Sequence, residues 1–250
     1  MARFRDFRSA NPALKKNPFA DISAALRGEV MTIDGTVNKT ALSLIILIIS
    51  ASWTWNMGMA GEPFMGWVMA GFIGGFVVAM ITMFKMSLAP YTTPLYAAFE
   101  GVALGGISVA FEAQYPGIAS QAVFLTFGTL GALLAAYRFG LIRATEKFKM
   151  GVFAATGGIA VVYLLNFIFG LFGGSIPLIH SSGSFGILFS CAVVVIAALN
   201  LVLDFDFIEQ GAAQGAPKYM EWYGAFGLLL TLVWLYMEIL RLLAKLRSDD

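Results

Sequence analysis

Long runs of hydrophobic residues, separated by short polar stretches, dominate this chain. A helix that crosses the hydrocarbon core of a bilayer needs about 20 apolar residues, whereas a membrane-spanning strand has about 10 residues of alternating character. The runs have the helical length and do not alternate. The pattern therefore predicts an all-α integral membrane protein with seven transmembrane helices. The predicted segments are Thr40 to Met59, Phe64 to Phe84, Thr93 to Phe111, Ile118 to Tyr137, Met150 to Phe172, Phe185 to Leu203 and Tyr223 to Leu243.

The composition excludes several classes of function. Of the 250 residues, 59% are hydrophobic and 12% are charged, a balance typical of membrane proteins rather than soluble domains. Sixteen Lys and Arg residues against fifteen Asp and Glu residues leave a net charge of +1, too little for binding nucleic acid. A single cysteine, a lone histidine (His180) and the lack of any catalytic motif indicate a chain that is not an enzyme and has no cofactor. The lipid bilayer is its first predicted partner.

Lysine and arginine residues are distributed unevenly over the polar stretches. They precede the first segment and follow the second, fourth and sixth, whereas the stretches after the first, third and fifth contain none. Because basic residues concentrate on the cytoplasmic side of a membrane, we expect residues 1–39 to form a basic cytoplasmic tail and residues 40–250 a seven-helix transmembrane domain. Basic residues at the end of the seventh segment break this rule. That segment either spans the membrane against the rule or re-enters and leaves the chain end inside.

Ionisable residues occur within or at the end of three segments: Glu100 in the third, Asp204 at the end of the sixth and Glu238 in the seventh. An ionised group at the bilayer centre costs about 2.5 to 3.5 kcal/mol on insertion scales, so such groups usually face the bundle interior and mark ion or proton pathways. Ordinary interpretations stay open beside this one. Glu238 and Arg241 are three residues apart on one helix and can pair with each other. Glu100 and Asn166 can be intramembrane polar groups that hydrogen-bond neighbouring helices.

The end of the sixth segment carries three acids within six positions. Asp204 lies four residues after Asn200, so the two side chains share a helix face. Asp206, two residues further, points roughly to the opposite side. We expect Asp204 to face the interior and Asp206 to meet cytoplasmic water together with Glu209, although the spacing alone leaves open which aspartate is the inward one.

Three stretches resemble a known family: "FEGVALGGI" in the third segment, "DFDFI" at the end of the sixth, and "LYMEILRLLAKLRSDD" at the end of the chain. They resemble the transmembrane Bax inhibitor motif family, in its bacterial YccA-like branch, and the resemblance covers residues 40–250. It implies six helices around a central seventh helix, a place in the bacterial cytoplasmic (inner) membrane, and a pH-dependent calcium leak.

In that family an acid of the sixth helix and an acid of the seventh share a proton, and a base at the end of the second helix helps to keep the pair closed. The matching positions here are Asp204, Glu238 and Lys85. This chain has Glu where the family usually has Asp in the seventh helix, and Lys where the family has Arg, which replaces a bidentate fork with a point charge. Asp206 stands where the family often has Gln.

The resemblance and the chemistry of carboxylates together predict a pH-sensitive calcium leak. Calcium takes oxygen ligands, and two carboxyl groups that approach each other in a low-dielectric site cannot both ionise easily. Such a pair titrates as a unit and can switch a helix packing. We expect Asp204 and Glu238 to form the gate and a calcium ligand pair, Lys85 to be a closing counter-charge, and Asp206 and Glu209 to form a cation vestibule.

Two other functions use the same features. The basic N-terminal tail can engage a protein partner, which would make the chain an interaction protein that modulates a membrane-bound protease. Alternatively, the intramembrane acids can couple proton movement to transport of a small solute. A leak moves calcium or protons without such a substrate.

Overall fold

The computed structural model describes residues 30–172 and 183–248. Most of the predicted basic tail and His180 lie outside the described residues. The described part contains seven helices that are long and apolar enough to cross a membrane, as predicted. The helical elements are α2 (Ile33–Met59), α3 (Met65–Phe84), the short 3₁₀ helix η2 (Met86–Leu88), α4 (Ala89–Gln114), α5 (Ile118–Arg138), α6 (Glu146–Leu171), α8 (Ser184–Ala213) and α9 (Met220–Ser248).

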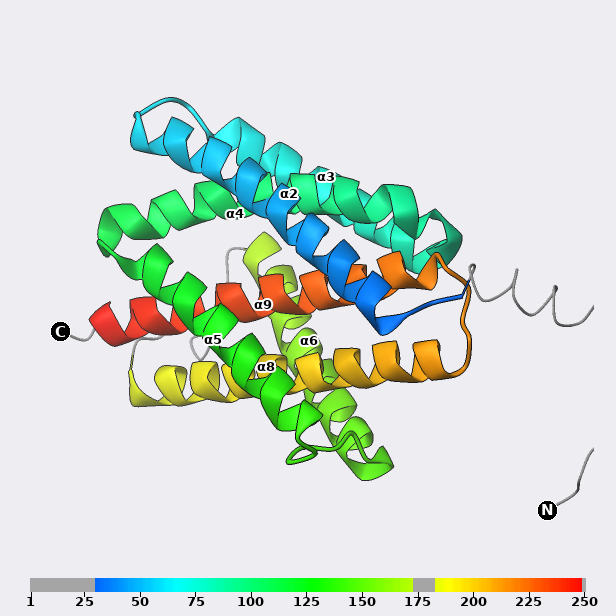
Figure 1. Ribbon diagram of the computed structural model, residues 1–250. Helices are drawn as coiled ribbons and strands as arrows, with labels where there is room; N and C mark the ends of the chain where they lie inside the picture. Colours follow the sequence, from blue (N-terminus) through cyan, green and yellow to red (C-terminus); the bar gives the residue numbers. More distant parts are fainter. Residues whose placement is uncertain (1–29, 173–182, 249–250) are drawn as a thin grey trace, which may run out of the picture.

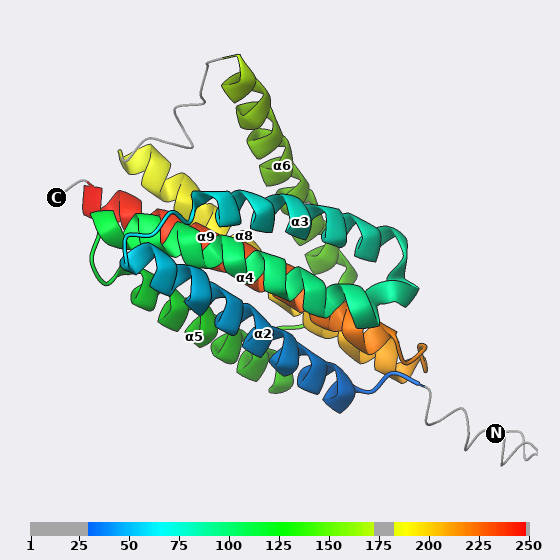
Figure 2. The same cartoon turned by 90° about the horizontal axis from the view of Figure 1, so that it is seen from above.

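Helix α9 lies in the middle of the arrangement (Figure 1). It packs along α8, which runs antiparallel to it, and also packs on α2, α5 and α4. By contrast, α3 packs mainly on α4, and α6 mainly on α8. Figure 2 shows the C-terminal part of α6 standing away from the other helices. Four helices therefore surround α9 closely, and the expected arrangement of six helices around the seventh is not confirmed in that form.

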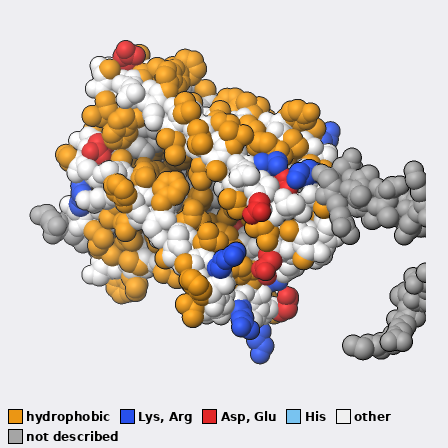
Figure 3. All heavy atoms as spheres, viewed as in Figure 1, with side chains coloured by type: hydrophobic (Ala, Val, Ile, Leu, Met, Phe, Trp, Pro, Cys, Tyr) orange, Lys and Arg blue, Asp and Glu red, His pale blue; other side chains and the backbone are white. Residues whose placement is uncertain are grey.

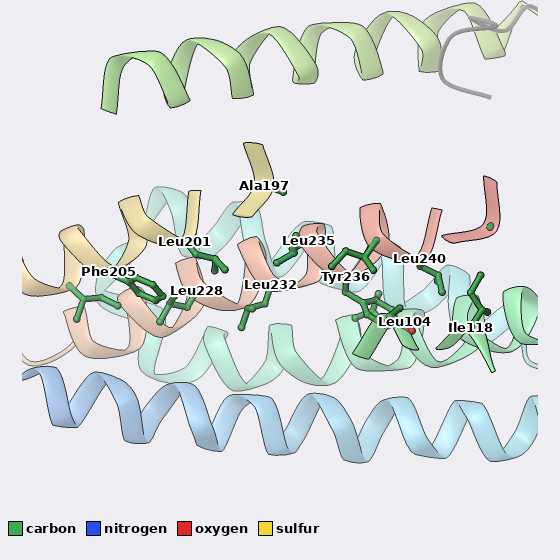
Figure 4. Packing of buried hydrophobic residues seen from close by; sticks show 14 of the residues in the cluster. Leu104, Ile118, Ala197, Leu201, Phe205, Leu228, Leu232, Leu235, Tyr236 and Leu240 are labelled. Atoms are coloured by element: carbon green, nitrogen blue, oxygen red, sulfur yellow. The ribbon is translucent and has the colours of Figure 1, made fainter. Parts of the chain in front are cut away.

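The largest apolar cluster lies where α8 meets α9 (Figure 4). Leu201 and Phe205 of α8 are four residues apart and present one face, and Leu228, Leu232 and Leu235 of α9 present the facing side. Lipid tails are as apolar as leucine, so burial by itself favours such an interface little inside a membrane. Close packing and interhelical polar contacts must hold the helices together instead.

Small residues supply close packing where α4 crosses α2. Gly101 and Gly105 of α4 are four residues apart, and a Cβ atom at either position would collide with the α2 backbone, at Leu47 and Ala51 respectively. The two backbones therefore approach each other directly, which only glycine allows here. This contact fixes α2 against α4.

Helix α2 begins at Ile33, earlier than the predicted start at Thr40. Thr32 is the N-cap residue, and its hydroxyl accepts a hydrogen bond from the backbone N–H of Gly35 at 3.0 Å. The first two turns contain polar residues, which an argument from hydropathy alone assigns to the tail. They are helical because they pack on the start of α9.

Glu221 at the start of α9 is fully buried and holds the start of α2 in place. Its carboxylate accepts hydrogen bonds from the backbone N–H of Thr32 at 2.9 Å and from the Thr32 hydroxyl at 2.8 Å. It also forms ion pairs with Lys39 and Lys218. A side chain at Gly35 would collide with this carboxylate. The cluster joins the first and last described helices.

Helix α9 continues without a break to Ser248, next to the connection between α4 and α5. Arg247 donates to the carbonyl oxygen of Pro116 at 2.9 Å and to Oε1 of Gln121 at 3.0 Å. The seventh segment is thus one unbroken helix that is long and apolar enough to cross a membrane. We name the end of the protein that contains Lys85 and the start of α2 the Lys85 end, and the opposite end the Pro116 end.

Candidate functional site

Asp204 lies on the face of α8 that meets α9. A Cβ atom at Gly227 would lie 3.7 Å from its Oδ1, an ordinary contact distance, so the carboxyl group lies directly beside Gly227 of α9. Thr231, one turn further along α9, supplies the polar group that faces the carboxyl. The second oxygen, Oδ2, is buried and has no hydrogen-bond partner among the described residues. Of the two aspartates that the sequence left open, Asp204 is the one that faces α9.

Glu238 is also buried, with 2% of its surface exposed, but its carboxylate is fully engaged. Oε1 accepts hydrogen bonds from the Tyr163 hydroxyl at 2.9 Å and from Nε1 of Trp234 at 3.2 Å. Nη1 of Arg241 lies 2.9 Å from Oε1 and 3.0 Å from Oε2. The Arg241 guanidinium also lies over the Tyr163 ring, 5.4 Å from its centroid. The pairing of Glu238 with Arg241, one of the interpretations of the sequence, is therefore present.

The structure does not bring Asp204 and Glu238 together. Asp204 faces Thr231, and Glu238 lies seven residues beyond Thr231, about 10 Å along the helix axis. The expected shared proton and two-carboxylate calcium site are therefore not formed in this state, because Arg241 occupies the carboxylate of Glu238. Within the ranges 30–172 and 183–248, no group of three or more His, Cys, Asp or Glu side chains could hold a metal ion.

Lys85 and Glu100 lie away from Asp204. Lys85 is the exposed C-cap residue of α3, and no described side chain forms an ion pair with it. Glu100 is half-buried between α4 and α3, where a Cβ atom at Gly75 would lie 2.9 Å from its Oε2. Lys85 thus has the position at the end of the second span that the resemblance implies, without contact to the acid that it is expected to counter.

Asp206 and Glu209 both line a cavity of about 840 Å³ at the Lys85 end, between α2, α5, α8 and α9. Oδ2 of Asp206 lies 2.9 Å from Nζ of Lys149 and accepts a hydrogen bond from Nε2 of Gln210 at 2.6 Å. Glu209 accepts a hydrogen bond from the Tyr137 hydroxyl. The two acids assigned to a cation vestibule therefore share one cavity.

The two asparagines named as intramembrane polar residues, Asn166 and Asn200, belong to α6 and α8. Nδ2 of Asn200 donates to Oγ1 of Thr156 at 2.8 Å and to the carbonyl oxygen of Ile196 at 2.8 Å. Asn200 therefore ties α8 to α6, one turn before Asp204. Asn166 lies half-buried in α6.

Sequence reasoning missed Thr231 opposite Asp204 and the buried Lys245. Nζ of Lys245 donates to the carbonyl oxygen of Gly186 at 3.1 Å and to Oγ of Ser190 at 2.9 Å. A spacing argument could have found both, because Gly227 and Thr231 form a pair of small residues four apart, and Lys245 lies seven residues after Glu238.

The chain was compared with known families, curated proteins and solved structures. A family model described as Bax inhibitor 1 like matches residues 11–248. No curated protein and no solved structure matches the chain. The family match spans nearly the whole sequence and includes all seven membrane-spanning helices. The chain therefore belongs to the Bax inhibitor 1-like family, whose members are generally non-enzymatic membrane proteins.

Proposed function

We propose that this protein is a pH-sensitive cation leak with calcium as the permeant ion, and that Asp204 is the group whose protonation controls it. The observation that carries the proposal is the buried, unpartnered Oδ2 of Asp204. The two acids that are fully buried in the described part, Glu221 and Glu238, each pair with a base. Among the residues of the ranges 30–172 and 183–248, Asp204 has the hydroxyl of Thr231 as a hydrogen-bond partner and no base as an ionic partner.

The two protonation states of Asp204 have different requirements. A neutral carboxyl group needs no counter-charge, and α8 and α9 can stay packed around it. An ionised carboxylate is costly to bury without a partner, so it favours either separation of the helices or the arrival of a cation. Calcium suits this position because it takes oxygen ligands in flexible geometry. The charge of Asp204 thereby biases the packing of α8 on α9.

A cation would reach Asp204 from the Lys85 end. Asp206 and Glu209 follow Asp204 on α8 and line the cavity at that end. Asp206 is paired with Lys149, whereas Glu209 accepts a hydrogen bond from the neutral Tyr137 hydroxyl and keeps its charge, so Glu209 is the carboxylate that attracts a cation most directly. In this proposal the two acids form the vestibule, and the Lys85 end faces the cytoplasm of a bacterial inner membrane.

The carboxyl pair that the resemblance implies belongs to a second state. Glu238 would have to leave Arg241 and approach Asp204, which requires α9 to move along α8. In the same state Lys85 would act as the closing counter-charge. In this structure, Glu238 is paired with Arg241, and Asp204 has no ionic partner among the described residues.

Calcium flux into proteoliposomes tests the proposal. Flux through the protein should rise from acid to neutral pH, and Asp204→Asn should abolish this dependence because an amide cannot ionise. Glu146→Gln is the matched control, since the Glu146 side chain is 89% exposed at the same end and lies away from Asp204. Identical pH profiles for the unmodified protein and Asp204→Asn would overturn the proposal. Proton movement that depends on an added solute would favour the transporter alternative.

A further inference from the structure

A groove runs along the protein between α2 and α5. Both helices pack on α9, but they do not pack extensively on each other. Two cavities lie between them, one of about 840 Å³ at the Lys85 end and one of about 430 Å³ further along. Leu44 of α2 and Leu232 of α9 line both cavities, so the two adjoin, and we name them together the α2–α5 groove. Figure 3 shows the hollowed face, bordered mainly by hydrophobic side chains.

The α2–α5 groove is apolar along most of its length. Its floor extends over α9 from Leu228 in the first cavity to Tyr236 in the second, about 12 Å of helix. Leu130 and Leu134 of α5 form one wall of the first cavity. Both volumes fall in the range of about 300 to 1,000 Å³ that is usual for small-molecule sites. Since the bordering helices are membrane spans, hydrocarbon chains are the material that surrounds this opening.

Charged groups are confined to the Lys85 end of the groove. Asp206 and Glu209 line that cavity, as do two arginines, Arg138 and Arg143. Asp206 is paired with Lys149, and Glu209 accepts a hydrogen bond from Tyr137.

The two arginines are the groups left for a ligand. Both are exposed, and no carboxylate in the described part of the chain forms an ion pair with either. A guanidinium group matches the geometry of a phosphate and binds it through two parallel hydrogen bonds. Two arginines against the one lining carboxylate without an ionic partner among the described residues, Glu209, leave a net positive charge at the mouth, which is complementary to an anionic headgroup.

We propose that the α2–α5 groove binds one anionic phospholipid of the surrounding membrane. Its phosphate lies at Arg138 and Arg143, and one acyl chain extends over Leu232 toward Tyr236. The polar mouth at a helix end and the apolar channel toward the bundle middle have the same order as the headgroup and chain of a lipid. The mouth of this site is the cavity that Asp206 and Glu209 also line, whereas Asp204 lies beside Gly227 and Thr231 and does not line it.

Lipid retention in native mass spectrometry tests the proposal. The full chain is released from micelles that contain equal amounts of phosphatidylglycerol and phosphatidylcholine with identical acyl chains. We expect one retained lipid, with phosphatidylglycerol favoured about tenfold, because both lipids carry the phosphate but the cationic choline of phosphatidylcholine is repelled by the two arginines. The double variant Arg138→Gln, Arg143→Gln should lower this ratio to about one. Lys147→Gln is the matched control, because Lys147 is exposed in the first turn of α6, next to the connection that carries Arg143, and does not line the groove.

A second variant tests the apolar part of the groove. Ala41→Phe places a ring in the first cavity, which Ala41 lines, and should lower retention of both lipids severalfold. Equal retention of the two lipids by the unmodified protein would overturn the proposal. So would an unchanged ratio in the double arginine variant, or full retention in Ala41→Phe. A lipid-free dimer in the same spectra would place a second copy of the chain on this face and would also overturn it.

Discussion

Arg241 lies one turn beyond Glu238 on α9, with Nη1 at 2.9 Å from Oε1 and 3.0 Å from Oε2 of its carboxylate. Tyr163 of α6 donates a further hydrogen bond to Oε1. The charge of Glu238 and its capacity to accept hydrogen bonds are therefore both met within the Pro116 half of the protein. As a consequence, Glu238 anchors α6 to α9. Oδ2 of Asp204, by contrast, is buried without a hydrogen-bond partner among the described residues.

Removal of Arg241 is expected to destabilise the protein more than removal of the charge that it neutralises. Arg241→Met leaves the carboxylate of Glu238 buried and uncompensated, and we expect a loss of about 2 kcal/mol because the guanidinium is partly exposed. Glu238→Gln keeps an acceptor for Tyr163 and should cost about 1 kcal/mol. Equilibrium unfolding in detergent measures both. The double variant should lose less unfolding free energy than the two single variants lose in sum. A loss equal to that sum would contradict the pairing.

Local patterns could be predicted from the sequence, and pairings between distant residues could not. The spacing of Glu238 and Arg241 indicated a pair, because this relation repeats within one helix. The spacing of the acids in α8 left open whether Asp204 or Asp206 faces inward. The separate positions of Asp204 and Glu238 depend on how α8 is aligned with α9. Periodicity along one helix does not contain this alignment.

The start of α2 shows the same limit. Residues 33–39 are too polar to appear in a hydropathy pattern, and their helix is held by Glu221, which is 189 residues away from Thr32 in sequence. Likewise, Asp206 forms an ion pair with Lys149 on α6, in addition to the hydrogen bond from Gln210 on its own helix. Long-range ion pairs of this kind require the fold to be known first.

A methyl group at Gly105 should disrupt the contact between α4 and α2. The Cβ atom of Gly105→Ala would collide with the carbonyl oxygen of Ala51, which is backbone and cannot rotate away. We expect a loss of about 1 to 3 kcal/mol, typical of overpacked sites. Gly128→Ala on α5 is the control, because no atom lies within 4 Å of the added Cβ. Thermal unfolding should separate the two variants, and equal melting temperatures would refute the close approach of the backbones.

Loss of the Glu221 charge should loosen the start of α2 before it unfolds the protein. In Glu221→Gln, the ammonium groups of Lys39 and Lys218 lose their counter-charge, and the hydrogen bonds from Thr32 weaken. Hydrogen exchange should become about tenfold faster at residues 33–39 and stay unchanged in the middle of α9. Asp34→Asn is a suitable control, since Asp34 lies in the first turn of α2, is exposed, and also carries a single negative charge. Uniform acceleration over the whole chain would show that Glu221 contributes to global stability only.

The vestibule and the gate should respond differently to charge removal. Asp206→Asn with Glu209→Gln removes two negative charges from the cavity at the Lys85 end and leaves Asp204 intact. We expect calcium flux in proteoliposomes to fall severalfold at low calcium and to recover at high calcium, because these charges only concentrate the cation. The dependence of flux on pH should be unchanged. Added monovalent salt should reduce flux in the unmodified protein and have little effect in the double variant. A shifted pH profile in the double variant would instead make Asp206 or Glu209 part of the gate.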